Sequence, residues 1–191
     1  MILVKIVDRS KDFTDTKGHW AENSIDFVVA RDLFKGTSKE EFSPDAYMTR
    51  GMFAVVLHNY ENNPEFKAEG QFFDVASNFW YKEAVDWLYD KGVVSGYEDG
   101  SFGAEDNITR EQLITLFYRY AGNPQYSNKN IEFNDAADIS EYAKDAILWA
   151  IEKGIINGKE DNNLDPMGTA TRAECAAIVQ RFIKTIKAPG I

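Results

Sequence analysis

The sequence predicts an all-α fold in which three helix-loop-helix repeats pack as one compact, pseudo-threefold symmetric assembly. One pattern of aspartate, aromatic, glycine and arginine residues occurs three times with nearly constant spacing. Apolar residues in each copy recur at helical spacing. A unit of about 60 residues with two short helices buries too little surface to be stable alone, so we expect the copies to share one core. Spacing alone also allows an open solenoid.

Each repeat is defined by four recurrent positions. A glycine lies sixteen residues after the aromatic residue, an arginine lies thirty residues after it, and an aspartate precedes it by five to seven residues. The recurrent residues are Asp15, Asp74 and Asp135; Trp20, Trp80 and Tyr142; Gly36, Gly96 and Gly158; and Arg50, Arg110 and Arg172. Three copies with this spacing indicate internal repeats. We divide the chain into an N-terminal arm (1–11), repeat 1 (12–62), repeat 2 (71–122), repeat 3 (131–184) and a tail (185–191).

The first predicted helix of each repeat follows the aromatic residue, with apolar residues at i, i+3, i+4 and i+8. It ends near Gly36, Gly96 and Gly158, where a residue able to adopt positive φ is expected just past a helix end. The next segment is rich in Gly, Pro, Asp and Asn, which predicts a loop.

The second predicted helix begins at the threonine of a Thr-Arg pair. Threonine is a good N-cap, and Thr109-x-x-Gln112 and Thr171-x-x-Glu174 can each form a capping box. The first repeat has Met52 at the third helical position and loses that half of the motif.

Capping does not explain the arginine, which faces the positive end of the helix dipole at a cost of roughly 0.3–1 kcal/mol. One interpretation is an internal salt bridge, for example to Asp15, Asp74 or Asp135 of a neighbouring repeat. The other is an anion site, in which free helix amides and the guanidinium bind a carboxylate or phosphate. The residues alone leave both open.

The other recurrent residues also allow two interpretations. Trp20, Trp80 and Tyr142 can fill the core, or they can offer a flat surface to a sugar ring. The aspartates can cap a helix or order a loop, or they can accept hydrogen bonds from sugar hydroxyls. The glycines can end helices, or they can let a ligand approach the backbone. Together the four residue types suit an acidic sugar.

Composition excludes several classes of function. The formal net charge of −10 argues against nucleic acid and anionic lipid as partners. No apolar run reaches transmembrane length, so we expect no membrane insertion. We do not interpret the N-terminal stretch as a signal peptide. The single cysteine, Cys175, aligns with apolar core positions. We expect His19 in a loop beside Trp20 and His58 on a helix surface. With no asymmetric acid–base pair, we predict no enzyme, no catalytic residue, no metal site and no cofactor.

The whole repeat, as in "FFDVASNFWYKEAVDWLYDKGVVSGYEDGSFGAEDNITREQLITLFYRYAG", resembles an S-layer homology domain. The units around "FTDTKGHWAENSI" and "DPMGTATRAECAAIVQRF" are similar to it, and the three copies cover about residues 12–184. The shared features are Phe-x-Asp, a Trp-Ala-type helix start, a Gly-rich loop and Thr-Arg-Ala-Glu.

The resemblance implies a compact, mostly helical, threefold pseudosymmetric fold. It also implies non-covalent anchoring of an exported protein to bacterial secondary cell wall polysaccharide, which often carries an anionic pyruvate ketal. The grooves between repeats would bind the sugar, and the four recurrent residue types named above would be its glycan-binding residues. Only residues 171–174 read Thr-Arg-Ala-Glu and Tyr142 replaces Trp, so we expect unequal grooves.

We therefore expect an extracellular location at the cell wall or S-layer, and a monomeric module cut from a larger surface protein. The alternative is a helical-repeat scaffold for protein interaction, which would expose an apolar groove and ignore polysaccharide.

Overall fold

The computed structural model describes residues 13–66 and 70–186, so the predicted arm (1–11) and most of the predicted tail lie outside the described residues. The α-helices of this part are α1 (Glu22–Val29), α2 (Arg50–Tyr60), α3 (Lys82–Asp90), α4 (Arg110–Tyr120), α5 (Lys144–Glu152) and α6 (Arg172–Ile186). Short 3-10 turns, all in repeat 3, are η1 (Ala136–Asp138), η2 (Glu141–Ala143) and η3 (Glu160–Asn162). Across these residues only isolated β-bridges form and no strand does, so the all-α prediction is confirmed. None of these helices combines the length and apolar character needed to cross a bilayer.

The first helix of each repeat is shorter than the sequence predicts. These helices end at Val29, Asp90 and Glu152. A residue with positive φ follows within three residues: Asp32 (56°), Gly92 (68°) and Gly154 (63°). The prediction that Gly36, Gly96 and Gly158 end these helices is therefore wrong.

Gly36, Gly96 and Gly158 are required for a different reason, which is close packing. A Cβ atom on any of them would overlap the phenylalanine ring that opens the same repeat: Phe13, Phe72 and Phe133 respectively. Of the three, only Gly96 also has a positive φ, at 72°. The approach of an aromatic ring to the backbone, rather than helix termination, selects glycine here.

The second helix of each repeat begins at the predicted threonine. Thr49 caps α2 through its side chain alone, whereas Thr109 and Gln112 form a complete capping box at α4. At α6 the Glu174 amide donates to Thr171 Oγ1 at 3.2 Å, and the Thr171 amide donates to Glu174 Oε2 at 2.9 Å. The prediction of two full capping boxes and one half is confirmed.

Backbone hydrogen bonds close the three repeats into a ring. The Met48 amide donates to the Ala170 carbonyl (3.0 Å), the Ala170 amide to the Ile108 carbonyl (2.9 Å), and the Ile108 amide to the Met48 carbonyl (2.9 Å). Antiparallel bridges between the neighbouring residues follow the same cycle. An open solenoid would leave the first and last repeats unjoined, so the compact pseudo-threefold arrangement is confirmed.

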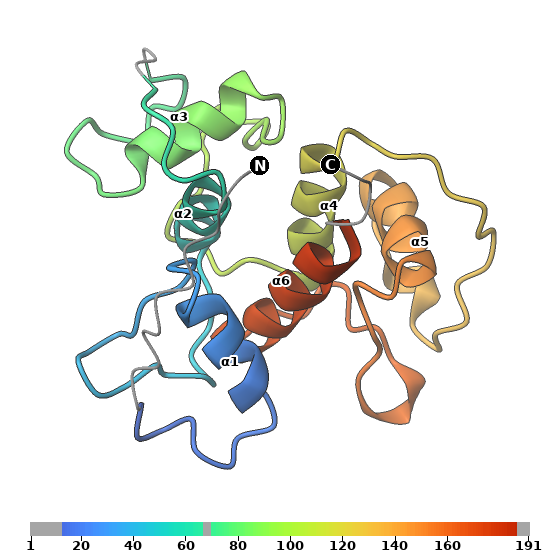
Figure 1. Ribbon diagram of the computed structural model, residues 1–191. Coiled ribbons are helices and arrows are strands. Elements are labelled where there is room, and N and C mark those ends of the chain that lie inside the picture. The colour runs from blue at the N-terminus through green and yellow to red at the C-terminus, as the bar shows by residue number, and fades with distance from the viewer. Residues whose placement is uncertain (1–12, 67–69, 187–191) are drawn as a thin grey trace.

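The helices pair between repeats rather than within them. The second helix of each repeat packs against the first helix of the next, which pairs α2 with α3, α4 with α5, and α6 with α1 (Figure 1). Each repeat therefore depends on its neighbours to bury its helices.

The core lies where α2, α4 and α6 meet. Phe117 stacks on Phe182 with ring centroids 4.2 Å apart, and Phe53 meets Phe117 edge-on at 5.1 Å. Cys175 is fully buried on α6, as its alignment with apolar positions predicts.

His58 does not lie on the helix surface, as the sequence suggested. Only 5% of it is exposed, because α3 packs over this face of α2. Its ring lies 5.5 Å from that of Trp87, and Nε2 is 3.0 Å from the Pro64 carbonyl. His19 lies in a loop with its ring 5.5 Å from that of Trp20, as expected.

Candidate functional site

The three motif arginines are buried and reach across to the next repeat. Each is the first residue of a second helix, and only 4–6% of each is exposed. Their Nε atoms donate to backbone carbonyls, Arg50 to Phe102 (3.0 Å), Arg110 to Leu164 (2.8 Å) and Arg172 to Phe42 (2.9 Å). Each arginine therefore binds a loop of the following repeat, and Arg172 joins repeat 3 back to repeat 1.

The leading aspartates bind the same loops from the other side. Both oxygens of each carboxylate accept backbone amides: Asp15 from Phe42 and Ser43, Asp74 from Phe102 and Gly103, and Asp135 from Leu164 and Asp165. One peptide group in each loop thus donates its N–H to an aspartate and offers its C=O to an arginine. The salt bridge considered from the sequence is realised indirectly, through a peptide group between the two charges.

The charged forms of the arginines and of Asp135 are the forms that make these hydrogen bonds to the loops. Burial lowers the pKa values of Arg50, Arg110 and Arg172, and nearby acidic groups oppose that shift. Arginine nevertheless stays charged in proteins. Burial works against ionisation of Asp135, but the Leu164 and Asp165 amides hold the pKa of its carboxyl below the ordinary value.

The helix amides that an anion was expected to use are already occupied. At α2 the Arg50 amide donates to the Asp106 carbonyl (2.9 Å), and the Gly51 amide donates to the Ala104 carbonyl (2.8 Å). The starts of α4 and α6 are bonded in the same way. The loop of the next repeat runs over each helix start, so the backbone there is not free to receive a ligand.

The aromatic residues are exposed and do not fill the core. Trp20 is 63% exposed, Trp80 62% and Tyr142 52%. In each repeat the following residue takes the buried position: Ala21, Tyr81 and Ala143. Of the two interpretations of the aromatic residues, burial in the core is therefore wrong.

A cavity of about 930 Å³ lies between repeats 2 and 3 and is called groove 2–3. It is lined by Arg110 of repeat 2 and by the loop around Gly158 of repeat 3, together with Asp135 and one face of α6. Trp20, from repeat 1, also lines it. The groove thus gathers the four recurrent residue types, but from three different repeats.

The second cavity, about 370 Å³, lies between repeats 1 and 2 and is called groove 1–2. Arg50, the loop around Gly96 and one face of α4 line it, and Tyr142 of repeat 3 completes the lining. Asp74 is not part of this lining; it binds the loop behind it.

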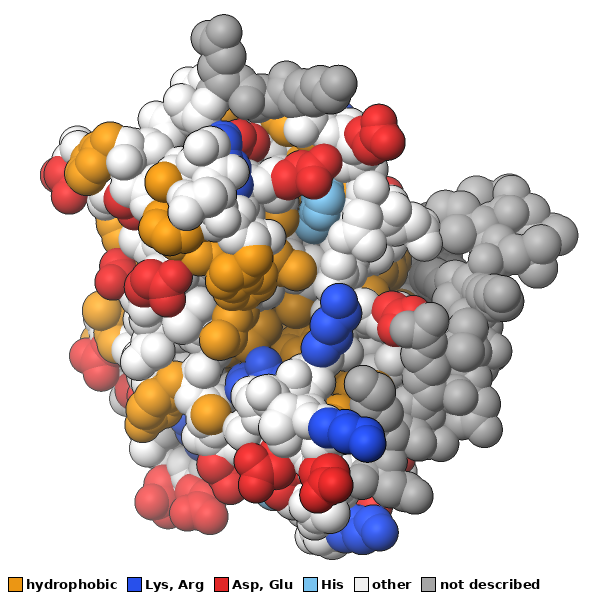
Figure 2. Space-filling model, turned by 90° about the vertical axis from the view of Figure 1, so that its left-hand side faces the viewer, with side chains coloured by type: hydrophobic (Ala, Val, Ile, Leu, Met, Phe, Trp, Pro, Cys, Tyr) orange, Lys and Arg blue, Asp and Glu red, His pale blue; other side chains and the backbone are white. Residues whose placement is uncertain are grey.

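The third junction, groove 3–1, is assigned by the repeat symmetry to Arg172, Gly36 and Trp80. Arg172 Nη2 donates to the carbonyl of Lys35, beside Gly36, at 2.7 Å. Figure 2 shows the side of the molecule that carries α1, α2 and α3, where hydrophobic side chains gather in a central hollow. Lysine and arginine side chains lie beside the hollow, and acidic ones lie around it.

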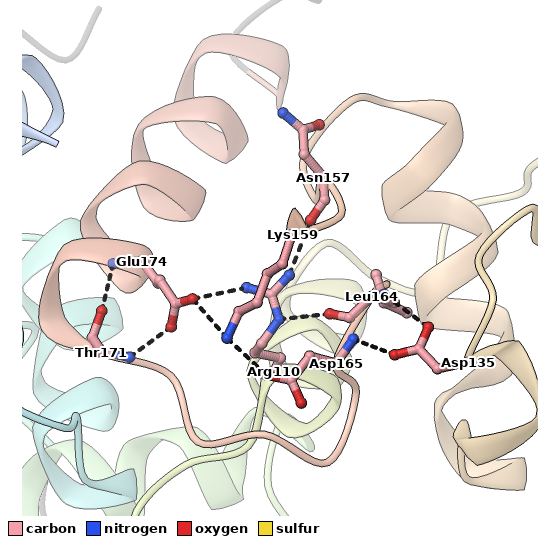
Figure 3. Close-up of polar contacts among 8 residues, drawn as sticks. All are labelled: Arg110, Asp135, Asn157, Lys159, Leu164, Asp165, Thr171 and Glu174. Carbon is pink, nitrogen blue, oxygen red and sulfur yellow. Dashed lines mark hydrogen bonds and ion pairs between the residues drawn. The ribbon is translucent and has the colours of Figure 1, made fainter. Parts of the chain in front are cut away.

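A charged network crosses groove 2–3 (Figure 3). Glu174 Oε1 lies 3.6 Å from Arg110 Nη1 and 3.0 Å from Lys159 Nζ, and Lys159 also pairs with Asp165 at 2.7 Å. Arg110 Nη2 donates to the Asn157 carbonyl at 2.9 Å. Both Nη atoms of Arg110 and the Nζ atom of Lys159 therefore already have partners within the protein.

In groove 1–2 a buried carboxylate fixes the aromatic residue. Glu111, only 1% exposed, accepts from Tyr142 Oη (2.7 Å), Ser140 Oγ (2.7 Å) and the Ser140 amide (3.0 Å). Repeats 1 and 3 have Gly51 and Ala173 at this position. Glu111 and Tyr142, the two local departures from the repeat pattern, are thus partners.

Sequence reasoning missed Glu111, Lys159 and a second arginine in each cavity. Arg119 lines groove 1–2 and Arg181 lines groove 2–3. Arg119 lies nine residues after Arg110, and Arg181 lies nine residues after Arg172. This repeated spacing could have identified both residues from the sequence.

Comparison with known proteins identifies the family. The family model of the S-layer homology domain matches residues 12–54, 72–114 and 132–176. "Exoglucanase XynX" of Acetivibrio thermocellus is 34% identical over 184 residues, which are 94% of this chain and 17% of that protein. "Amylopullulanase" of Thermoanaerobacterium thermosulfurigenes is 34% identical over 179 residues, 91% of this chain and 10% of that protein. "Surface-layer 125 kDa protein" of Lysinibacillus sphaericus is 26% identical over 185 residues, 93% of this chain and 15% of that protein.

The fold and grooves thus define a helical, three-repeat binding module, and the chain belongs to the S-layer homology family. Domains of this family anchor proteins to the cell wall, and the predicted location at the cell wall or surface is confirmed by the S-layer and cell-surface relatives. Enzymes of different names share this segment with S-layer proteins, so the segment is not the source of their activities. The chain spans less than a fifth of the length of these relatives.

Proposed function

We propose that this chain anchors a larger protein to the bacterial cell wall by binding secondary cell wall polysaccharide, with a pyruvylated sugar as the preferred unit. The observation that carries this proposal is the composition of the grooves. An exposed aromatic residue and a buried arginine line the same cavity in each of these grooves, and this pairing suits a ring-shaped ligand that bears an anion.

The aromatic residues have the clearest proposed role. The rings of Trp20, Trp80 and Tyr142 would stack on the apolar face of a sugar ring, because a large exposed aromatic side chain is stabilised by covering its face. The arginines Arg50, Arg110 and Arg172 would attract the carboxylate of a pyruvate ketal while they also hold the loops in place.

The aspartates and glycines would act mainly through the loops. Both carboxylate oxygens of Asp15, Asp74 and Asp135 already accept backbone amides, so we propose that these residues shape the groove floor. Gly36, Gly96 and Gly158 keep the same loops close to the phenylalanine rings beneath them.

Several grooves on one body would give avidity for a repeating polymer. Binding of one sugar unit raises the effective concentration of the next unit at the neighbouring groove. Weak single sites would therefore suffice for firm attachment to the wall, in keeping with a non-covalent anchor.

Calorimetric titration with a synthetic pyruvylated wall-type disaccharide tests this proposal. We expect Trp20→Ala and Tyr142→Ala each to weaken binding about tenfold or more at one groove, because stacking on an aromatic ring contributes on the order of 1–3 kcal/mol. Phe73→Ala is the matched control, because Phe73 is exposed but lines neither cavity. Equal binding by all variants, or no binding by the wild-type chain, would contradict the proposal. Alanine variants of the motif arginines are less useful, because they would also release a loop.

A further inference from the structure

The grooves differ at the third residue of the second helix. This position holds Gln112 in groove 1–2 and Glu174 in groove 2–3, and both side chains line their cavities. Both also complete a capping box with the preceding threonine. The two residues therefore have the same backbone role, and the charge on the side chain is what distinguishes them.

In groove 2–3 the carboxylate of Glu174 already occupies the place of an anion. It lies 3.6 Å from Arg110 Nη1 and 3.0 Å from Lys159 Nζ, as Figure 3 shows. An incoming carboxylate would have to compete with it for the same cations. The like charges would repel each other, and in a partly buried site this repulsion is screened little by salt.

In groove 1–2 the third residue of the helix is the uncharged Gln112, and Arg50 is incompletely bonded. Its Nε donates to Phe102. Within residues 13–66 and 70–186, no hydrogen bond or ion pair engages its Nη1 or Nη2. Yet the residue is 94% buried and lines the cavity. Its guanidinium carbon lies 4.6 Å from the centroid of the Tyr97 ring. A buried cation with unpaired donors is costly unless an anion joins it.

The charged residues that line the two grooves also favour groove 1–2 as the site for an anion. The lining of groove 1–2 carries two arginines and one glutamate, whereas that of groove 2–3 carries three cations and five carboxylates. Asp106 also lies near Arg50, and Glu111 binds Tyr142, but the lining of groove 1–2 is less acidic than that of groove 2–3, so groove 1–2 is the more favourable of the two for an anion.

We propose that the side chain at positions 112 and 174 sets the charge preference of each groove. Groove 1–2 takes the carboxylate-bearing sugar unit, whose oxygens bind Arg50 Nη1 and Nη2. Groove 2–3 takes an uncharged unit of the same polymer. This inference rests on the proposed function, and it assigns different sugar units to two grooves that share one architecture.

The experiment exchanges the two side chains by Gln112→Glu and Glu174→Gln. Both glutamine and glutamate serve in a capping box, so each variant keeps its helix start, which circular dichroism and thermal unfolding would check. The ligands are a pyruvylated disaccharide and its methyl ester, which differs by one added methyl group and lacks the charge. Titrations are done in a Trp20→Ala/Trp80→Ala background to isolate groove 1–2 and in a Tyr142→Ala/Trp80→Ala background to isolate groove 2–3.

We expect groove 1–2 to bind the acid about tenfold more tightly than the ester, and Gln112→Glu to remove that preference, because it adds a like charge beside the ligand. Glu174→Gln should give groove 2–3 a preference for the acid that it lacks in the wild type. If the ratio of acid affinity to ester affinity is the same with and without these exchanges, the inference is overturned, although the proposal of polysaccharide binding stands. If the otherwise unmodified chain binds neither sugar, the proposed function fails and the inference fails with it.

Discussion

At the scale of the residue, the arginine of the Thr-Arg pair is explained by what it binds across a repeat boundary. The cost of a cation at a helix start is offset by a charge-assisted hydrogen bond to a carbonyl whose own peptide N–H is held by an aspartate. The bonded residues are 52, 54 and 130 positions apart in the chain. Sequence reasoning recognised that the arginine needed a partner, but such separations give no local signal of which partner it has.

The packing of glycine against phenylalanine gives a prediction for stability. Gly158 has an ordinary negative φ, and a Cβ there would lie 2.5 Å from the Phe133 ring. We expect Gly158→Ala to lower the free energy of unfolding by about 1–3 kcal/mol through overpacking, measured by urea denaturation. Because the smaller side chain makes room for the methyl group, the double variant Gly158→Ala/Phe133→Leu should be destabilised by less than the sum of its two single changes. Strict additivity would contradict this explanation.

The hydrogen bond between Tyr142 and Glu111 gives a second prediction at this scale. Tyr142→Phe keeps the ring but leaves the buried carboxylate with Ser140 alone. We expect a loss of about 1–3 kcal/mol in unfolding free energy. A variant as stable as the wild type would show that Glu111 does not depend on the tyrosine.

At the scale of the element, the linker before repeat 3 is held by the end of α5. Glu152 accepts the amides of Ser127 (2.5 Å) and Asn128 (2.9 Å), and these bonds, with Lys153, lower its pKa to about 2. A carboxyl with a depressed pKa stabilises the fold above its unfolded value, and this contribution is lost as the pH falls toward the folded value.

Stability should therefore fall between about pH 4.5 and pH 2. We expect Glu152→Gln to flatten this part of the pH profile in thermal unfolding, because the amide does not titrate. Hydrogen exchange of the Ser127 and Asn128 amides, corrected for intrinsic rates, should lose protection over the same interval in the wild type. An identical acid profile in both proteins would contradict this role for Glu152.

The helices and the starts of the second helices were largely predictable, but the C-terminal ends of the first helices were not. The threonine caps and the apolar stripes of the second helices follow from local rules. The first helices end early because the chain turns at Asp32, Gly92 and Gly154. The sequence pattern drew attention instead to glycines whose constraint comes from a ring far away in the chain.

At the scale of the whole molecule, the repeats form one cooperative unit. Each second helix packs on the first helix of the next repeat, and the last repeat bonds back to the first. We expect a single unfolding transition in urea, with the same midpoint by fluorescence and circular dichroism. Arg172→Ala should shift the midpoint to lower urea but keep one transition. Separate transitions for individual repeats would contradict the closed ring.

The residue types that line the grooves were predictable, but the repeats that supply them to each groove were not. The sequence predicted the four residue types of a groove, and the family resemblance implied grooves between repeats, but neither indicated which repeat supplies each residue. Pairing of helices between repeats brings Trp20 of repeat 1 to Arg110 of repeat 2 and Gly158 of repeat 3. This arrangement depends on the ring closure, which no spacing within one repeat encodes.

The most direct test of the central claim is a nitrogen-15 spectrum of the tryptophan indoles during titration with a wall-polysaccharide fragment that carries both pyruvylated and uncharged sugar units. The chain has four tryptophans: Trp20 and Trp80 are exposed at the proposed grooves, whereas Trp87 and Trp149 are buried and serve as internal controls. If sugars bind in the grooves, the indole signals of Trp20 or Trp80 should move and saturate while those of Trp87 and Trp149 stay in place. Binding at saturation with no movement of Trp20 or Trp80 would contradict the account.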